Sequence, residues 1–230
     1  MALNLFRAIL ETVQDFIAPP LCVLCRRYSE LLLCPSCSTL LEKLRIRPPR
    51  CYRCGSPMYG RKCKRCHGIK LPYALARGAY LYTGPIAHVV EAMKYHGFRS
   101  LISWMANQML PLMEEFTGQL LVPIPLHPTR IRERGFSQTK ALVQALSQQT
   151  GLPVGELLER TRHTRSQTTL ETQERLRNVR GAFQARASFP EPVILVDDVM
   201  TTGATIKEAA KILLKSGVPR VEVLVFAITP

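Results

Sequence analysis

The thirteen residues VILVDDVMTTGAT, Val193–Thr205, decide the fold of this 230-residue chain. The first four are a continuous apolar run, which predicts a buried strand over 193–196. Two adjacent carboxylates, Asp197 and Asp198, follow in the expected turn, and threonines and a glycine then lead into a helix predicted over 204–216. A buried strand that passes through a short polar turn into a helix is the repeating unit of an α/β domain.

The polar residues of this stretch suit a phosphate beside a ribose. The N-terminus of a helix presents backbone N–H groups and the positive end of the helix dipole, and Gly203 lets the backbone approach an anion closely. Further hydrogen-bond donors are the hydroxyls of Thr201, Thr202 and Thr205. The two carboxylates can accept from a ribose diol or bind Mg²⁺. The sequence therefore predicts a ribose 5-phosphate site; the simpler alternative is a helix-capping turn. It contains neither a Walker nor a Rossmann fingerprint.

Alternating strands and helices are also predicted upstream of this stretch. The expected strands span residues 77–82, 120–125, 193–196 and 221–228, and the expected helices span residues 85–95, 99–116, 136–149 and 204–216. Strands that are apolar on both faces and alternate with helices predict a mostly parallel sheet. Residues 160–180 are polar and strongly basic, which predicts an exposed excursion with a short helix near 171–178. The whole pattern predicts an α/β domain over 71–230.

All eight cysteines lie before this domain, in four CxxC pairs. Two CxxC turns supply the four thiolates of a tetrahedral structural zinc site. The spacing favours one zinc on Cys22, Cys25, Cys34 and Cys37 and a second on Cys51, Cys54, Cys63 and Cys66, although pairing across the two halves stays open. Residues 21–70 are therefore expected to form a double zinc ribbon. Disulfides are the alternative, but residues 1–17 lack a secretory leader, so a reducing, cytoplasmic setting is expected.

The N-terminal residues predict an amphipathic helix. Apolar side chains recur at 3–4 spacing over 3–17, and Pro19 and Pro20 end the pattern, so residues 1–20 form a first segment. This helix is more easily explained by docking on protein than on membrane, because its polar side is not rich in Lys and Arg. No apolar run approaches the roughly 18 residues of a membrane span, so an integral membrane protein is not expected.

The chain is strongly basic, with a formal net charge of +14, and should attract polyanions such as nucleic acid or phosphorylated metabolites. Tyr52 and Tyr59 interleave with basic residues around the later cysteines, as in surfaces that bind single-stranded nucleic acid. The basic residues are Arg45, Arg47, Arg50, Arg53, Arg61, Lys62, Lys64 and Arg65. A solvated face of a small zinc module explains them equally well, so this interpretation stays open.

The stretch 193–205 resembles the 5-phosphoribosyl-1-pyrophosphate (PRPP) loop of type I phosphoribosyltransferases. Three further motifs are MKYHGFRSL (93–101), VPIPLHPTRIRERGFSQT (122–139) and LRNVRGAF (176–183). With the cysteine-rich start, they make the chain similar over essentially its whole length to the ComF/GntX family. These are phosphoribosyltransferase-like proteins of bacterial competence and DNA utilisation. One departure is Ser137, where the family usually has Asn.

The resemblance implies the roles of individual residues. It places the ribose hydroxyls on Asp197 and Asp198, the 5-phosphate on the loop, and the pyrophosphate near 123–125. The implied PRPP-binding residues are Val196, Asp197, Asp198, Thr201, Thr202, Gly203, Ala204, Thr205 and Arg134, with Arg130 and Arg132 as alternatives to the last. The implied catalytic residues are Asp197, Asp198, Arg162 and Arg165, with Arg175 in the same excursion. Lys94 and Arg99 suit either a phosphate or a nucleic-acid contact.

Three functional hypotheses follow from the resemblance. The first is a cytoplasmic, zinc-containing protein that binds PRPP with magnesium and single-stranded DNA and acts with the competence machinery in DNA uptake or use. The second is an enzyme that displaces pyrophosphate from C1 of PRPP with a nucleobase. The third is a non-catalytic regulator that senses PRPP. The acceptor pocket of an enzyme is not recognisable in the sequence, so PRPP binding is better supported than turnover.

Overall fold

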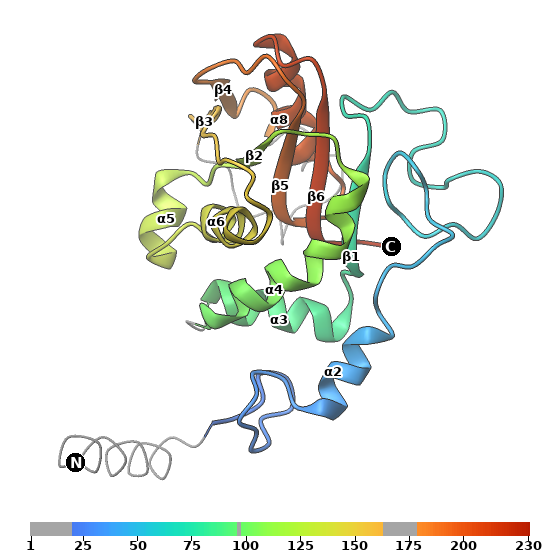
Figure 1. The fold of residues 1–230 in the computed structure, drawn as a ribbon, viewed down its shortest axis with the longest axis vertical. Coiled ribbons are helices and arrows are strands. Elements are labelled where there is room, and N and C mark those ends of the chain that lie inside the picture. Colours follow the sequence, from blue (N-terminus) through green and yellow to red (C-terminus); the bar gives the residue numbers. More distant parts are fainter. Residues whose placement is uncertain (1–19, 96–97, 163–178) are drawn as a thin grey trace. The chain divides into compact units, whose positions relative to one another are not determined.

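The computed structural model describes residues 20–95, 98–162 and 179–230 (Figure 1). The chain divides into two compact units, residues 1–43 and residues 44–230. The helix expected over 3–17 and the short helix expected near 171–178 lie outside the described residues. In the part of the chain that the structure describes, no helix is long and apolar enough to span a membrane.

Among its described residues, 20–43, the smaller unit contains the first two CxxC turns and the helix α2 (Pro35–Glu42). Pro35 occupies the first turn of α2, where a missing backbone N–H costs nothing. The sequence pattern predicts no regular element here, because the helix is only 8 residues long. Cys37 and Leu41 are its buried residues. So small an apolar content favours a unit whose fold depends on bound metal.

The larger unit is built on a four-stranded parallel sheet with the strand order β1-β6-β5-β2. The strands are β1 (Ala76–Leu81), β2 (Leu120–Pro123), β5 (Val193–Met200) and β6 (Val221–Ile228). Every residue of the central strand β6 is buried, which agrees with apolar strands covered on both faces. The expected parallel α/β architecture is therefore confirmed.

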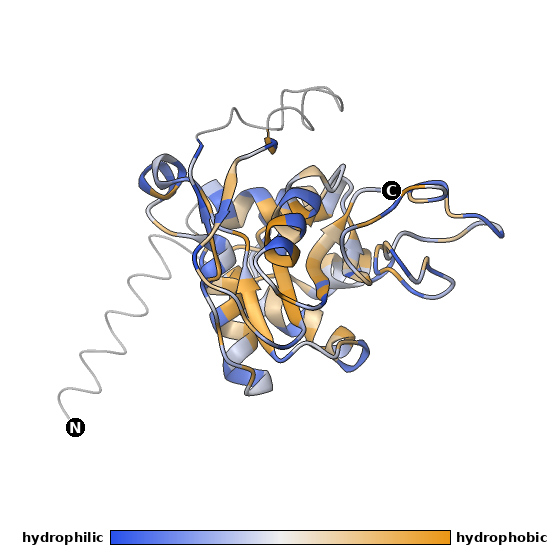
Figure 2. Ribbon diagram, turned by 90° about the horizontal axis from the view of Figure 1, so that it is seen from above, coloured by the Kyte–Doolittle hydropathy of each residue, from blue (hydrophilic) through white to orange (hydrophobic). Residues whose placement is uncertain are grey.

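Helices cover both faces of this sheet, and the strands form an apolar layer between them (Figure 2). The helices are α3 (Gly84–Tyr95), α4 (Ser100–Met109), α6 (Gln138–Thr150) and α8 (Ala204–Lys215). On one face, Ile206, Ala209 and Leu213 of α8 join the core of the sheet. On the other, Trp104 of α4 stacks on Tyr80 with their ring centroids 6.2 Å apart.

Two expected elements differ from the structure. The helix expected over 99–116 is α4 followed by a 3-10 helix, η1 (Leu110–Glu115), because Pro111 cannot continue the α-helical hydrogen bonds. The strand expected over 193–196 continues to Met200, because β6 pairs with it as far as Ile228. Asp197 and Asp198 therefore lie in the strand, not in a turn.

Three short elements of the larger unit were also not predicted from the sequence. The helix α5 (Pro128–Arg134) follows β2, and its N-cap is His127, whose side chain accepts from the backbone N–H of Thr129. The strands β3 (Leu158–Arg160) and β4 (Phe183–Ala185) form a separate antiparallel pair. This pair brings together the two ends of the basic excursion.

The later cysteines belong to the same compact unit as the sheet. The buried side chain of Arg77, on β1, donates through Nε to Oε2 of Glu115 at 2.6 Å and through Nη1 to the carbonyl of Tyr52 at 2.7 Å. Gly55, with φ of 72°, passes so close to β1 that a Cβ there would lie 2.6 Å from the carbonyl oxygen of Ala76. The expected boundary near residue 70, between the double zinc ribbon and the α/β domain, remains a prediction.

Candidate zinc centres and phosphate site

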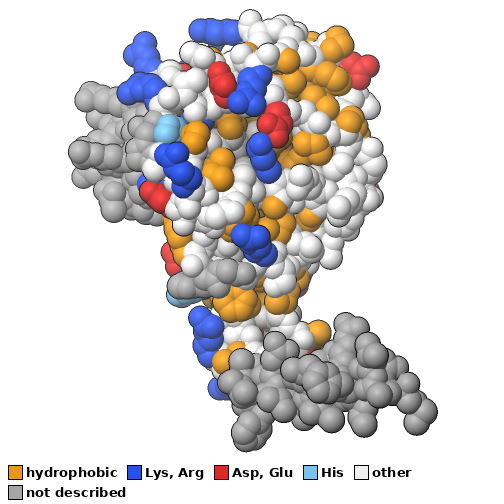
Figure 3. Space-filling model, turned by 90° about the vertical axis from the view of Figure 1, so that its left-hand side faces the viewer, with side chains coloured by type: hydrophobic (Ala, Val, Ile, Leu, Met, Phe, Trp, Pro, Cys, Tyr) orange, Lys and Arg blue, Asp and Glu red, His pale blue; other side chains and the backbone are white. Residues whose placement is uncertain are grey.

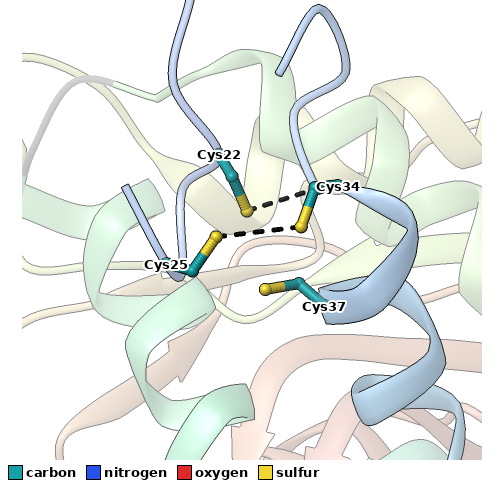
Figure 4. A group of neighbouring side chains, drawn as sticks. All are labelled: Cys22, Cys25, Cys34 and Cys37. Atoms are coloured by element: carbon teal, nitrogen blue, oxygen red, sulfur yellow. Dashed lines mark hydrogen bonds between the residues drawn. The ribbon is translucent and has the colours of Figure 1, made fainter. Parts of the chain in front are cut away.

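The first cysteine group has the geometry of a tetrahedral metal site. The Sγ atoms of Cys22, Cys25, Cys34 and Cys37 all lie within 4.8 Å of one another and point towards a common centre (Figure 4). The Sγ atoms of Cys25 and Cys34 are 3.7 Å apart. Zinc–sulfur bonds of about 2.3 Å in a tetrahedron place sulfurs about 3.8 Å apart, so the group fits zinc.

The second group, Cys51, Cys54, Cys63 and Cys66, repeats this geometry with all four residues buried. The Sγ distances are 3.5 Å from Cys51 to Cys66 and 3.5 Å from Cys54 to Cys63. The structure therefore assembles the two groups along the chain as the spacing favours, and the alternative pairing across the halves is not the one adopted. His67 is exposed, and its ring is outside both groups.

The pKa values of the cysteine thiols also indicate that each group needs a bound cation. Burial opposes ionisation of Cys22, but backbone N–H donors outweigh it and lower the pKa to about 6; the pKa of Cys63 is lowered to about 7 in the same way. Burial and neighbouring thiols raise the pKa of Cys37 to about 12, and they also raise that of Cys66. Four thiolates so close together become stable only when a metal ion supplies positive charge.

The candidate phosphate loop, residues 201–205, joins the end of β5 to the first turn of α8. Gly203, the N-cap of α8, has a φ of 73°, which a side chain would strain, and the helix has no side-chain cap there. The backbone N–H of Ala204 donates to Oγ1 of Thr202 at 3.3 Å. Thr201, Thr202 and Thr205 are half-buried. Val196 and Ala204 are buried, so these two residues can offer a ligand only backbone groups.

The two carboxylates occupy the carboxyl end of the central strand β5. Asp198 is 5% exposed, and its Oδ2 lies 2.5 Å from Nζ of Lys94, at the end of α3. Asp197 accepts from the backbone N–H of Asp198 at 2.9 Å. Burial, and then the charge of Asp198, raise the pKa of Asp197 to about 8. A site of this kind favours ligands that bring positive charge or hydroxyl donors.

Three basic side chains from different elements interact electrostatically with these carboxylates or with Lys94. Lys94 comes from α3, and Arg134, in the last turn of α5, donates from Nη2 to the hydroxyl of Tyr95 at 3.0 Å. Arg160 of β3 is mostly buried; burial lowers its pKa, and the negative charge of Asp197 acts in the opposite direction. Arg160 was missed because the sequence pattern does not predict the short β3–β4 pair that brings it here.

The remaining predicted residues lie in different surroundings. Arg162 is exposed and donates to the carbonyl of Arg180 at 2.9 Å, at the base of the excursion, whereas Arg165 and Arg175 lie outside the described residues. The guanidinium of Arg99 covers the ring of Phe136, 4.8 Å from its centroid. Ser137 is the N-cap of α6, a role that serine and asparagine both fill well.

The segment that carries the second cysteine group, residues 51–66, is the second ribbon, and it also presents a basic and aromatic surface. The side chains of Tyr59 and Tyr52 are 89% and 67% exposed. A pocket of about 380 Å³ lies beside Tyr59 and is also lined by Lys62 and Lys64. On the face of the larger unit that Figure 3 shows, by contrast, Lys and Arg are scattered among acidic and apolar side chains.

The fold and these sites define an α/β protein with a parallel sheet that carries a double zinc ribbon. Residues 13–67 match the family model of the double zinc ribbon domain. The chain is 31% identical to the DNA utilization protein YhgH of Salmonella typhimurium over 89% of this chain and 95% of that protein. It is 28% identical to competence protein F of Haemophilus influenzae, over 88% and 94%. The chain therefore belongs to the ComF/YhgH family of competence and DNA utilization proteins.

Two solved structures show weaker overall similarity. Glutamine PRPP amidotransferase from Bacillus subtilis has a TM-score of 0.37 and 19% identity, over 54% of this chain and 26% of that chain. UMP synthase from Leishmania donovani has a TM-score of 0.35 and 14% identity, over 60% and 22%. This chain therefore spans about a quarter of the length of either enzyme.

Proposed function

We propose that this protein binds PRPP with Mg²⁺ at the carboxyl end of β5 and acts in the cytoplasm in the use of incoming DNA. One observation carries the PRPP proposal: Asp197 and Asp198 lie in the carboxyl-terminal half of the central strand β5, and the chain continues from this strand through a short loop into the N-terminus of α8, where Gly203 is an N-cap without a side chain. Ribose hydroxyls would donate to the carboxylates while the 5-phosphate meets the positive end of the helix.

Each part of the ligand has a matching group at this edge of the sheet. Thr201, Thr202 and Thr205 supply hydroxyls for the phosphate. Mg²⁺ would offset the negative charge of the two carboxylates, and burial disfavours the ionisation of Asp197 in particular. The pyrophosphate, the most negative part of PRPP, would lie near Arg134 and Arg160. This distribution of charge is the reason to prefer PRPP to an uncharged sugar.

Calorimetric titration with PRPP and Mg²⁺ tests this proposal. The unaltered chain should bind with micromolar affinity or better, and Asp197→Asn/Asp198→Asn should weaken binding at least a hundredfold, since both ribose contacts and the metal are affected. The matched control is Glu156→Gln/Glu159→Gln, which removes two carboxylates from the exposed side of the β3 region. The absence of PRPP binding by the unaltered chain would refute the proposal.

A second candidate function is phosphoribosyl transfer from PRPP to a nucleobase. It is supported by the pairing of β3 with β4 at the two ends of the basic excursion, and by the electrostatic interaction of Arg160, on β3, with Asp197. Arg162 and Arg165 would then act on the pyrophosphate leaving group. Release of pyrophosphate on mixing PRPP, Mg²⁺ and a panel of nucleobases tests transfer. PRPP binding without release would leave a non-catalytic, PRPP-sensing role.

The DNA part of the proposal rests on the named relatives and on the surface of the second ribbon. Exposed Tyr59 can stack on a base while Lys62 and Lys64 contact phosphates. A gel shift with single-stranded DNA should show binding that weakens as salt rises. Lys62→Ala/Lys64→Ala should weaken it about tenfold, whereas Lys211→Ala/Lys215→Ala, which removes the same charge from α8, should not. Equal losses in both variants would argue against this surface.

A further inference from the structure

The side chain of Arg65 joins the second zinc group to the phosphate loop. Arg65 stands between Cys63 and Cys66 in a CxxC turn. Its Nη1 donates to the carbonyl of Thr229 at 2.6 Å. Its Nη2 donates to the carbonyls of Met200, at 3.3 Å, and Thr201. One guanidinium therefore contacts three backbone carbonyls of the sheet and the loop.

Two of these three carbonyls, those of Met200 and Thr201, belong to the peptide groups that begin the phosphate loop. Met200 is the last residue of β5, and Thr201 is the first residue after it. Because a trans peptide group is planar, its carbonyl and its N–H point in opposite directions. Holding the carbonyls of Met200 and Thr201 towards Arg65 directs the N–H groups of Thr201 and Thr202 away from the ribbon. It also neutralises two carbonyl dipoles that would repel an incoming anion.

The position of Arg65 depends in turn on the metal site. Both flanking cysteines are ligand residues and are at most 9% exposed, and the backbone N–H of His67 donates to the carbonyl of Cys63 at 3.0 Å. The conformation of the turn that carries Arg65 is thus fixed at both ends by two of the four metal-ligand cysteines. Arginine suits this role because its planar fork contacts several acceptors at once, which a lysine ammonium on a flexible stem does less well.

We propose that Arg65 is a positioning residue through which the zinc on Cys51, Cys54, Cys63 and Cys66 sets the conformation of the phosphate loop. Zinc in this site and PRPP at the loop are then thermodynamically coupled, so each strengthens binding of the other. The proposal rests on the proposed PRPP binding and adds to it a structural role for the second ribbon beyond DNA contact.

The first test compares substitutions of Arg65 in the full chain. Arg65→Met should weaken PRPP binding about tenfold while both zinc ions are retained, and Arg65→Lys, which keeps the charge, should recover part of the loss. The control is Lys70→Met, which removes the same charge from an exposed residue that has no hydrogen bond to these carbonyls, and this variant should bind PRPP within twofold of the unaltered chain. Equal PRPP affinity in Arg65→Met and the unaltered chain would overturn the coupling but not PRPP binding itself.

The second test needs no substitution at Arg65, so it remains decisive if Arg65→Met fails to fold. Zinc transfer from the unaltered chain to a chromogenic chelator is followed with and without saturating PRPP and Mg²⁺. The buried second group should release zinc in the slower phase, and PRPP should slow that phase several-fold. An unchanged slow phase, measured at a PRPP concentration that calorimetry shows to be saturating, refutes the coupling. Absence of any PRPP binding in calorimetry refutes both this inference and the proposed function.

Discussion

The ammonium of Lys94 lies 2.5 Å from Oδ2 of Asp198, and this ion pair joins the end of α3 to the carboxyl end of β5. The two side chains are 18% and 7% exposed. Burial opposes the charge on Lys94, but the carboxylates of Asp198 and Asp197 outweigh it and raise the pKa of Lys94. Lys94 therefore stays charged, and its ammonium lies against Asp198 at the place proposed for the ribose.

Lys94→Met should destabilise the protein by roughly 3 kcal/mol, near the lower end of the range for breaking a buried ion pair, because Asp198 loses its counter-charge. Chemical denaturation followed by tryptophan fluorescence measures this change, since Trp104 lies in the same unit. Lys94→Met/Asp198→Asn should recover part of the loss. If Lys94→Met and the double variant unfold at the same denaturant concentration, pairing with Lys94 does not offset the cost of burying the Asp198 carboxylate.

Asp197 should make stability decrease as pH rises. Burial and Asp198 raise its folded-state pKa to about 8, above the unfolded value of about 3.9, so the folded state binds the extra proton between these values. Ionisation therefore costs stability progressively up to about pH 8. Melting temperatures between pH 6 and 8.5, where the zinc ligands stay bound, should decline more steeply in the unaltered chain than in Asp197→Asn.

The same substitution separates stability from function. Asp197→Asn should raise the melting temperature at pH 8, since a neutral amide needs no counter-charge, while it weakens PRPP binding. Functional residues commonly lower the stability of a protein when their ligand is absent. A lower melting temperature for Asp197→Asn than for the unaltered chain at pH 8 would contradict a raised pKa of Asp197.

Loss of the two zinc ions should have unequal consequences. Cys51→Ser should leave one zinc per chain and lower the melting temperature of the sheet by more than about 5 °C, because the second group belongs to the same compact unit. Cys22→Ser should also leave one zinc but affect the sheet little, because its group belongs to residues 1–43. Metal analysis with calorimetric melting measures both. Equal shifts would contradict the division of the chain.

The approach of the second ribbon to β1 predicts the effect of a single methyl group. Gly55→Ala should cost about 2 kcal/mol or more, since the new Cβ would meet the carbonyl oxygen of Ala76 in a backbone conformation with positive φ. The control is Gly60→Ala, where a Cβ meets nothing within 4 Å, and it should change stability by less than about 0.5 kcal/mol. Urea denaturation distinguishes the two, and equal stability of both variants would exclude a tight contact at Gly55.

Much of this protein was determined by its sequence alone. The apolar strands at 193–196 and 221–228, the CxxC spacing and the stretch that follows Val196 predict the parallel sheet, both zinc groups and the phosphate loop. These features depend on local chemistry: apolar periodicity, the ligand spacing of a metal, and the residues that a helix N-terminus needs near an anion. Such preferences act over a few neighbouring residues, so they can be recognised in a single sequence.

Only the tertiary structure decided which distant residues meet. The extension of β5 to Met200 depends on pairing with β6, and the approach of Arg160 to Asp197 depends on the short β3–β4 pair. The contact of Arg65 with Thr201 joins residues 136 positions apart. No local pattern encodes such a contact, because its free energy is gained only after the ribbon and the sheet have folded against each other.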